Sequence, residues 1–296
     1  MKRVVIGSRG SDLALWQANH VKSQLKNIGV SAEIKIIKTQ GDKIQHLSFD
    51  KLEGKGFFTK EIEEALLNEE IDLAVHSHKD LETTPPEGLT IAAVSERENP
   101  SDLLLIRNEA VDDSEKWGLS KSATVGTSSA RRKSQLLDYR SDLQIKDLRG
   151  NVPTRIEKLR KQPYDAIVLA KAGVDRLGID LGEFHVVVLD PEEFVPAPAQ
   201  GVLGLQIRSQ DLELHEILQN LNDKNVANRI GLERKILNLL DGGCQLPLGA
   251  YCSQEGRLFV SFAKSIDSKV HRLNYTINGD YNFAEKVIAD LRRSEN

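Results

Sequence analysis

The chain has 296 residues, of which 40% are hydrophobic and 28% charged, and its formal net charge is −4. This length predicts two or three domains, each able to bury its own core. The negative charge argues against a dedicated nucleic-acid-binding protein. No apolar run approaches the roughly 20 residues that cross a bilayer, and the start is too quickly polar for a secretory signal. Two cysteines, Cys244 and Cys252, are too few for a disulfide framework, which favours a cytoplasmic location.

In the first third of the chain, short apolar runs alternate with amphipathic stretches, the pattern of βαβ units. Ser11 is a plausible N-cap for the first helix. In chain order we expect strands at 4–6, 32–38 and 71–76 and helices beginning near residue 11 and residue 58. The segment 41–56 holds three glycines and lacks periodicity, which is typical of a functional loop.

A second unit is expected to begin after the charged, proline-ended segment 96–100. Its predicted strands lie near 125, near 145, at 166–170 and at 186–189, and its predicted helices begin at 129 and span 152–161. The proline-rich stretch 191–198 predicts a linker, and helices should follow at about 211–221 and 225–240. From Pro247, alternating runs at 258–263 and 270–277 and a helix near 283–292 predict a small α+β domain with an antiparallel sheet.

Polar side chains follow the buried strand that ends near His76, at the edge where open α/β sheets usually bind ligands. His76 and His78 would face the same side of a strand, so a metal site is one interpretation, but no ligand cluster completes it. A histidine that orients the turn is the simpler interpretation of His76. Asp80, next to Lys79, is a candidate for stabilising a developing positive charge or accepting N–H donors.

Arginines and hydroxyl groups gather at several strand-to-helix turns. The turn after the strand near 125 carries Thr127, Ser128, Ser129, Arg131 and Arg132. Other such turns carry Arg9, Arg149, Arg155 and Arg176. Helix N-termini and guanidinium groups bind anions, and the phosphate-loop pattern with Gly-Lys-Ser/Thr is absent. Each arginine alone could be a surface ion pair, but together they predict a cleft for a ligand with many carboxylates.

The Gly-Gly-Cys turn at 242–244 is a third candidate site. A thiol on a turned, accessible loop can be nucleophilic or covalently modified. Cys252 lies in a strand-like run and fits a small buried hydrophobe instead. For Lys158, Arg160 and Lys161 a solvated helix face is the better interpretation.

These segments, taken in order, resemble the hydroxymethylbilane synthase (porphobilinogen deaminase) family over essentially the whole chain. The matching segments are 7–17, 54–61, 75–80, 126–132, 149–155, 198–201 and 242–245. The resemblance implies an α/β fold of two periplasmic-binding-protein-like α/β domains with a hinge, plus a small C-terminal α+β domain. The implied boundaries are 1–95 with 202–219 for domain 1, 101–195 with 224–242 for domain 2, and 246–296 for domain 3.

The same resemblance implies a transferase of tetrapyrrole (haem) biosynthesis. It would condense four porphobilinogen molecules head to tail, release ammonia, and hydrolyse off the linear hydroxymethylbilane. Cys244 would carry a dipyrromethane cofactor through a thioether bond, and Asp80 would stabilise the cationic azafulvene left when ammonia departs. No metal, nucleic acid or membrane partner is implied, and the chain is expected to be a monomer.

The remaining site residues are also assigned by this resemblance. Cofactor contacts would be Ser77, Lys79, Thr127, Ser128, Ser129, Arg131 and Arg132. Contacts to the substrate and growing chain would be Arg9, Ser11, Gln17, Arg149, Arg155 and Arg176, with Lys55 on a flap. Two positions depart from the family pattern: an apolar residue is more common at His78, and an acid is more common at Gln206.

Two other interpretations come from different classes of protein. A hinged two-lobe anion-binding protein without catalysis would explain an arginine-lined cleft, but neither the Gly-Gly-Cys turn nor a third domain. An RNA-associated module that uses the basic helix at 129–133 is weaker, because the net charge is negative and no aromatic residues are interleaved with the basic ones.

Overall fold

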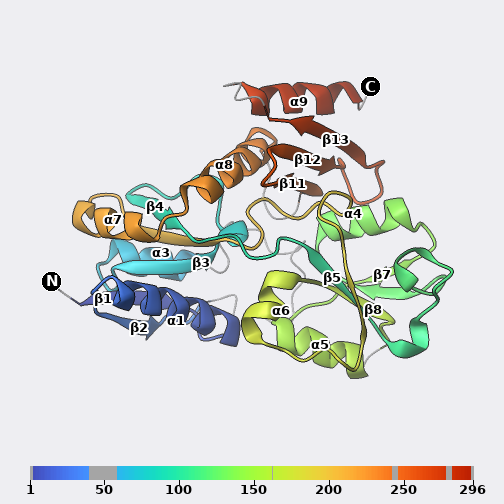
Figure 1. The fold of residues 1–296 in the computed structure, drawn as a ribbon, viewed down its shortest axis with the longest axis horizontal. Coiled ribbons are helices and arrows are strands. Elements are labelled where there is room, and N and C mark those ends of the chain that lie inside the picture. The colour runs from blue at the N-terminus through green and yellow to red at the C-terminus, as the bar shows by residue number, and fades with distance from the viewer. Residues whose placement is uncertain (1–2, 40–58, 162, 242–245, 278–281, 295–296) are drawn as a thin grey trace. The chain divides into compact units, whose positions relative to one another are not determined.

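The computed structural model describes residues 3–39, 59–161, 163–241, 246–277 and 282–294 (Figure 1). The chain divides into two compact units. Unit 1 comprises residues 1–98 and 200–231, and unit 2 comprises residues 99–199 and 232–296. Within the described ranges, no helix is long and apolar enough to cross a membrane.

Unit 1 is built on a five-stranded sheet with the order β2-β1-β3-β10-β4. The strands are β1 (Val4–Ser8), β2 (Ala32–Ile36), β3 (Leu73–Ser77), β4 (Leu89–Val94) and β10 (Leu203–Arg208). Strand β1 is parallel to β2 and β3, whereas β10 is antiparallel to both of its neighbours. The helices are α1 (Asp12–Asn27), α3 (Lys60–Leu67), α7 (Leu212–Leu218) and the 3₁₀ helices η2 (His78–Asp80) and η5 (Gln219–Leu221).

Local sequence explains why α1 forms and packs where it does. The side chain of Ser11 accepts a hydrogen bond from the Ala14 N–H, which confirms the predicted N-cap. Val21 and Leu25 lie on one face of the helix and are fully buried in the unit 1 core. At the neighbouring strand, a Cβ at Gly7 would lie 2.2 Å from Ile71 Cδ1, so a larger residue there would force the Ile71 side chain to move.

Unit 2 contains a second five-stranded sheet with the order β7-β6-β8-β5-β9. The strands are β5 (Asp102–Ile106), β6 (Thr124–Gly126), β7 (Gln144–Lys146), β8 (Ala166–Ala170) and β9 (His185–Val188). The helices are α4 (Ala130–Tyr139), α5 (Val152–Lys161), α6 (Lys171–Leu177) and the 3₁₀ helices η3 (Asn108–Ala110) and η4 (Lys116–Gly118). Three parallel strands are again followed by an antiparallel one, because β5 runs opposite to β8. The two sheets share one strand order, as expected for the predicted pair of periplasmic-binding-protein-like domains.

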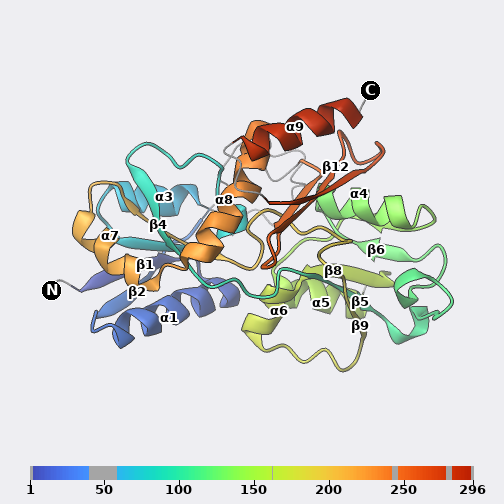
Figure 2. The ribbon, with the colours of Figure 1, turned by 45° about the horizontal axis from the view of Figure 1, so that its top comes forward.

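The C-terminal part of unit 2 is a small antiparallel sheet with a helix, which confirms the predicted α+β domain. Its strands are β11 (Leu248–Cys252), β12 (Arg257–Phe262) and β13 (His271–Thr276), and its helix is α9 (Phe283–Ser294). Figure 2 shows α9 lying across this sheet, and Val287 and Leu291 bury the helix against it. Helix α8 (Lys224–Leu239) precedes this domain, and its C-terminal half contributes Ile236 to the same core.

The stretch 191–198, predicted as a linker, has no helix or strand but is not a loose connection. Phe194 and Val195 are almost completely buried. The Val195 carbonyl accepts from Arg131 and Gln135, and its N–H donates to Gln135. Ala250 in β11 donates to the Pro196 carbonyl. The segment is therefore fastened to both α4 and the C-terminal sheet.

Candidate functional site

The carboxyl end of β3 presents an accessible carboxylate on a fixed turn. Asp80 is exposed and closes the 3₁₀ helix that follows the strand. The turn is anchored because the His78 N–H donates to the Val202 carbonyl at 2.9 Å. Lys79 Nζ donates to Gln200 Oε1 at 3.2 Å, which directs this ammonium group to the segment before β10. A ligand can therefore reach Asp80 without displacing a buried partner.

Four more of the predicted residues lie near this end of the unit 1 sheet. Gln17 Nε2 donates to Ser77 Oγ at 2.9 Å, which links α1 to the end of β3. Arg9 follows directly after β1, and Ser11 caps α1. The sheet thus brings four predicted polar residues to the ends of two neighbouring parallel strands, where ligands of open α/β sheets bind.

The expectation that His76 and His78 share one face of a strand is wrong, because β3 ends at Ser77 and His78 begins the 3₁₀ turn. His76 is buried and its Nε2 lies 3.1 Å from Gln206 Oε1. Burial lowers the pKa of His76 to about 4; the hydrogen bond to Gln206 opposes this shift and the charge of Arg9 adds to it. Among the described residues, no group of three or more His, Cys, Asp or Glu side chains could hold a metal ion.

In unit 2, the hydroxyl groups after β6 shape the turn that leads into α4. Thr127 Oγ1 accepts from the Ser129 N–H at 3.2 Å, and Ser129 Oγ caps the helix by accepting from the Arg132 N–H. Ser128 Oγ donates to the Leu148 carbonyl at 3.1 Å and accepts from the Leu148 N–H at 3.0 Å. This turn therefore places a capped helix N-terminus, which attracts anions, at the carboxyl end of a parallel strand.

Arg131 and Arg132 form a buried charge cluster with Asp102, a residue that the sequence did not single out. Arg131 Nη1 lies 2.9 Å from one Asp102 oxygen and Arg132 Nη2 lies 2.7 Å from the other. Burial alone would raise the pKa of Asp102, but the two guanidinium charges and their hydrogen bonds outweigh it and hold this pKa below its ordinary value. Two cations face one anion, so the cluster carries one excess positive charge inside unit 2.

Three further predicted arginines lie at the next turns of unit 2. Arg149 is partly buried just before α5, and Arg155 Nε donates to the Gly150 carbonyl at 2.7 Å. Gly150 has a φ of +118°, and a Cβ there would lie 2.6 Å from Thr154, so glycine is required at this turn. Arg176 lies on α6 and is buried. Arg149 thus follows β7, whereas Arg155 and Arg176 lie on the helices that follow β7 and β8.

The two remaining predicted site residues, Lys55 and Cys244, lie outside the described residues. Cys252 is fully buried in β11, and its N–H donates to Glu233 Oε1 at 2.7 Å, which confirms it as a structural thiol. The other oxygen of Glu233 accepts from the Ala199 N–H at 2.7 Å. This buried carboxylate on α8, like Asp102, was missed by the sequence analysis.

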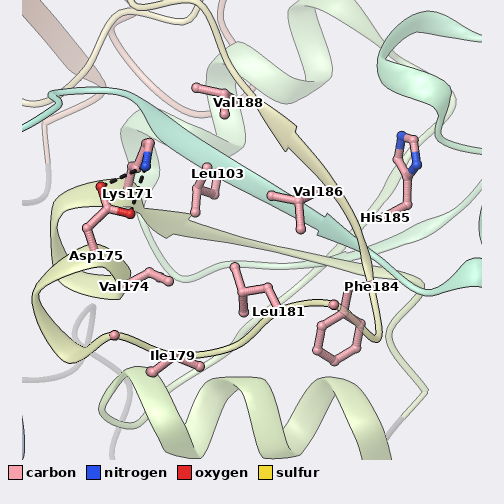
Figure 3. A pocket seen from close by; sticks show the side chains of 12 residues that line it. Leu103, Lys171, Val174, Asp175, Ile179, Leu181, Phe184, His185, Val186 and Val188 are labelled. Atoms are coloured by element: carbon pink, nitrogen blue, oxygen red, sulfur yellow. Dashed lines mark hydrogen bonds and ion pairs between the residues drawn. The ribbon is translucent and has the colours of Figure 1, made fainter.

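One hollow in the described part of unit 2 lies elsewhere. It has a volume of about 640 Å³ and is lined by Leu103, Val186 and Val188 among other apolar side chains. Figure 3 shows Lys171 paired with Asp175 at its rim. None of the predicted site residues lines this hollow, so it gives no support to the predicted polycarboxylate site.

Comparison with known proteins gives consistent sequence matches. A family model described as "Porphobilinogen deaminase, dipyromethane cofactor binding domain" matches residues 4–216. The porphobilinogen deaminase of Sulfurimonas denitrificans is 46% identical over 255 residues, covering 86% of this chain and 80% of that protein. The porphobilinogen deaminase of Clostridium novyi is 41% identical over 297 residues, covering 98% and 97%.

Solved structures give a weaker likeness. The periplasmic VFT2 domain of Bordetella pertussis BvgS has a TM-score of 0.45 at 13% identity and covers 74% of this chain and 86% of that one. The methionine binding protein MetQ has a TM-score of 0.46 at 12% identity and covers 76% and 92%. These values add nothing to what the sequence relatives show.

Proposed function

Because the chain belongs to the porphobilinogen deaminase family, we propose that it condenses four porphobilinogen molecules head to tail on a covalently bound dipyrromethane. It releases ammonia at each step and finally hydrolyses off the linear tetrapyrrole hydroxymethylbilane. Each porphobilinogen brings two carboxylates, so the growing chain needs several cationic partners and the departing ammonia needs one nearby anion.

The observation that carries this proposal is the accessible carboxylate of Asp80 on an anchored turn at the end of a parallel strand. Loss of ammonia from an aminomethylpyrrole leaves positive charge on the pyrrole. A fixed carboxylate stabilises that charge as it develops and can accept the pyrrole N–H. Because the turn is held by the backbone of Val202, Asp80 needs no rearrangement to do so. We assign Asp80 the catalytic role.

The residues of unit 2 suit the cofactor. When bound, dipyrromethane supplies a covalent primer whose free pyrrole carbon attacks the incoming unit, and it carries carboxylate side chains. The excess positive charge of Arg131 and Arg132 over Asp102, together with the capped start of α4, fits such an anionic group. We propose Cys244 as the point of attachment, with further contacts from Ser77 and Lys79 of unit 1 and from these residues of unit 2: Thr127, Ser128, Ser129, Arg131 and Arg132.

For the substrate and growing chain, the proposed contacts are Arg9, Ser11, Gln17, Lys55, Arg149, Arg155 and Arg176. Guanidinium groups bind carboxylates through paired hydrogen bonds, which explains why arginine predominates in this set. We further propose the three-domain division with boundaries 1–95 with 202–219, 101–195 with 224–242, and 246–296. A cytoplasmic monomer completes the proposal, with no nucleic acid, membrane or metal partner.

Intact-protein mass spectrometry tests the proposal directly. The purified chain should weigh more than its amino acids by the mass of one dipyrromethane, and brief exposure to porphobilinogen should add a ladder of equal increments. The increment should be absent from Cys244→Ser and present in the matched control Cys252→Ala, because Cys252 is buried in β11. A protein that binds carboxylates but never gains covalent mass would instead be a hinged anion-binding protein.

A further inference from the structure

Three buried side chains of unit 1 form a hydrogen-bonded network that includes His76 on the strand before the proposed catalytic turn. His76 on β3, Gln206 on β10 and Glu63 on α3 are all less than 10% exposed. His76 Nε2 lies 3.1 Å from Gln206 Oε1, and Gln206 Nε2 lies 3.0 Å from Glu63 Oε1. The register explains the first contact, because Gly204 pairs with His76 and Gln206 is two residues further along the same face.

The chemistry of these groups fixes the direction of both hydrogen bonds. The Glu63 carboxylate only accepts, so the Gln206 amide nitrogen must donate to it. The Gln206 carbonyl oxygen then faces His76, so His76 Nε2 must carry a proton and donate. The other ring nitrogen, Nδ1, therefore carries no proton as long as the ring is neutral. Burial and the resulting low pKa of His76, about 4, keep the ring neutral near pH 7.

The neutral form of His76 matters because a charged residue, Arg9, lies nearby. Strands β1 and β3 are parallel with Gly7 level with Ala74, so continuing the register two residues brings Arg9 level with His76. The charge of Arg9 acts on the ring, since it lowers the pKa of His76. Among the described residues, the elements around His76 thus contribute one cation, Arg9 after β1, one anion, Glu63 on α3, and the neutral Gln206 on β10. A proton on His76 would place a second cation beside Arg9.

We propose that His76 is a positioning residue for Arg9: Glu63 and Gln206 hold it as a neutral imidazole protonated on Nε2, so that the ring adds no second positive charge beside Arg9 when Arg9 binds substrate carboxylate. The role of Arg9 rests on the function proposed above, whereas the ionic state of His76 does not. In this arrangement Gln206 separates the carboxylate from the imidazole. A carboxylate at position 206 instead of position 63 would contact the imidazole directly and would favour its protonated, cationic form.

The sharpest test exchanges the two side chains in the double variant Glu63→Gln/Gln206→Glu. Composition, net charge and the number of hydrogen-bonding groups stay the same, but the carboxylate now contacts His76 directly. Ring-nitrogen NMR of ¹⁵N-histidine-labelled protein, assigned with His76→Gln, should show the wild-type ring protonated on Nε2 alone and not titrating between pH 5 and 8. The exchanged variant should show an imidazolium at pH 7. A wild-type ring that titrates near 6.5, or that carries its proton on Nδ1, overturns the proposal.

Steady-state kinetics then tests the effect on Arg9. At pH 7 the exchange should raise the KM for porphobilinogen about fivefold with a smaller change in kcat, because a like charge now lies beside Arg9. In an Arg9→Ala background the same exchange should leave KM unchanged. If the exchange protonates His76 and KM stays at the wild-type value, His76 does not position Arg9. If wild-type protein consumes no porphobilinogen at all, the proposed function fails, and the NMR result still decides the state of His76.

Discussion

The two five-stranded sheets share a strand order but bury different chemistry at the end of their third strand. In unit 1, His76 at the end of β3 belongs to a network in which the ring and the Gln206 amide are both neutral. In unit 2, Asp102 pairs with Ala170 at the end of β8 and is held by Arg131 and Arg132. Near the end of the third strand, unit 1 therefore has an imidazole on that strand that is hydrogen-bonded to an amide, whereas unit 2 has an ion cluster whose carboxylate lies on the neighbouring strand β5.

This difference matches the charge that each unit is proposed to stabilise, which is a cationic intermediate at Asp80 in unit 1 and cofactor carboxylates in unit 2. The unit 1 network contains the Glu63 carboxylate but no cation, so it adds no positive charge near Asp80, which is proposed to stabilise a positive charge. A buried ion cluster costs desolvation and is tolerated when its geometry is good, but here it leaves an excess cation where carboxylates are proposed to bind. One fold can thus supply opposite electrostatic surroundings by changing a few buried side chains.

The largest expected effect comes from removing the proposed catalytic anion of unit 1. Asp80→Ala should lower the rate of hydroxymethylbilane formation by about 10³-fold, the scale of losing one preorganised electrostatic group. Because Asp80 is exposed, the melting temperature and the covalent cofactor mass should stay unchanged. The matched control is Glu87→Ala, another exposed acid of unit 1, which should keep full activity. Wild-type turnover in Asp80→Ala would place the stabilising anion elsewhere.

Breaking the ion cluster of unit 2 should cost stability. Asp102→Asn leaves two buried guanidinium groups without a counter-charge and should lower the free energy of unfolding by about 3–5 kcal/mol. The control is Asp147→Asn, which removes an ion pair to Lys133 from a half-exposed carboxylate and should change stability little. Urea denaturation measures both. Equal stability of the two variants would contradict the structural role of the cluster.

Acid should destabilise unit 1 before unit 2. The pKa of His76 falls from an ordinary 6.5 to about 4 on folding, so the unfolded chain binds the proton more readily between these values. Stability should therefore drop as the pH falls from 6.5 to 4, by up to about 3 kcal/mol. The pKa of Asp102 is also lowered, but its contribution is lost only as the pH falls below its ordinary 3.8.

Hydrogen exchange measured at pH 7, 5 and 4 would show which of the two units loses stability first. Amides of β3 and β10 should lose protection before those of β5 and β8. His185→Gln, which replaces an exposed histidine of unit 2, serves as the control and should leave the profile unchanged. Earlier loss in unit 2 would show that buried His76 is not the acid-sensitive group.

The smallest effect is expected at the arginine turns of unit 2. Arg155→Ala or Arg149→Ala should slow turnover about tenfold by removing one charge-assisted contact to the growing chain. Partial adducts should then accumulate and appear as intermediate masses. Arg160→Ala is the control, because Arg160 lies on the exposed face of α5 and pairs with Glu157 and Glu183. A normal distribution of masses in both site variants would remove these arginines from the elongation path.

Local signals were enough to predict many elements. The cap at Ser11, the apolar strand 166–170 and the helix 152–161 were all found where the sequence placed them. Strands β4, β5 and β10 and helix α6 were not predicted, and β11 was indicated only by the strand-like run at Cys252. Every residue of β5 and β10 is buried, so neither strand shows the alternation that marks a half-exposed strand. Both strands also join the sheets out of chain order, which periodicity cannot reveal.

The polar turns of the site were also predictable, but their buried partners were not. Asp102 lies 30 residues from Arg132, and Gln206 lies 143 residues from Glu63. Contacts between residues so far apart in the sequence produce no periodic pattern from which they could be predicted. A weaker signal did exist, because Gln206 interrupts an apolar run and Asp102 directly precedes one, and a polar group inside a buried strand must find a partner.

The strand order of unit 1 also affects how the chain matures during synthesis. Strand β10 lies between β3 and β4, yet it leaves the ribosome roughly 110 residues after β4. At cellular rates of translation this leaves β4 without its neighbour for about 5–20 s. During that interval the apolar strand Leu89–Val94 would be a target for chaperones and proteases. Nascent chains stopped before residue 203 should be cleaved there, whereas chains extended well beyond residue 208 should resist.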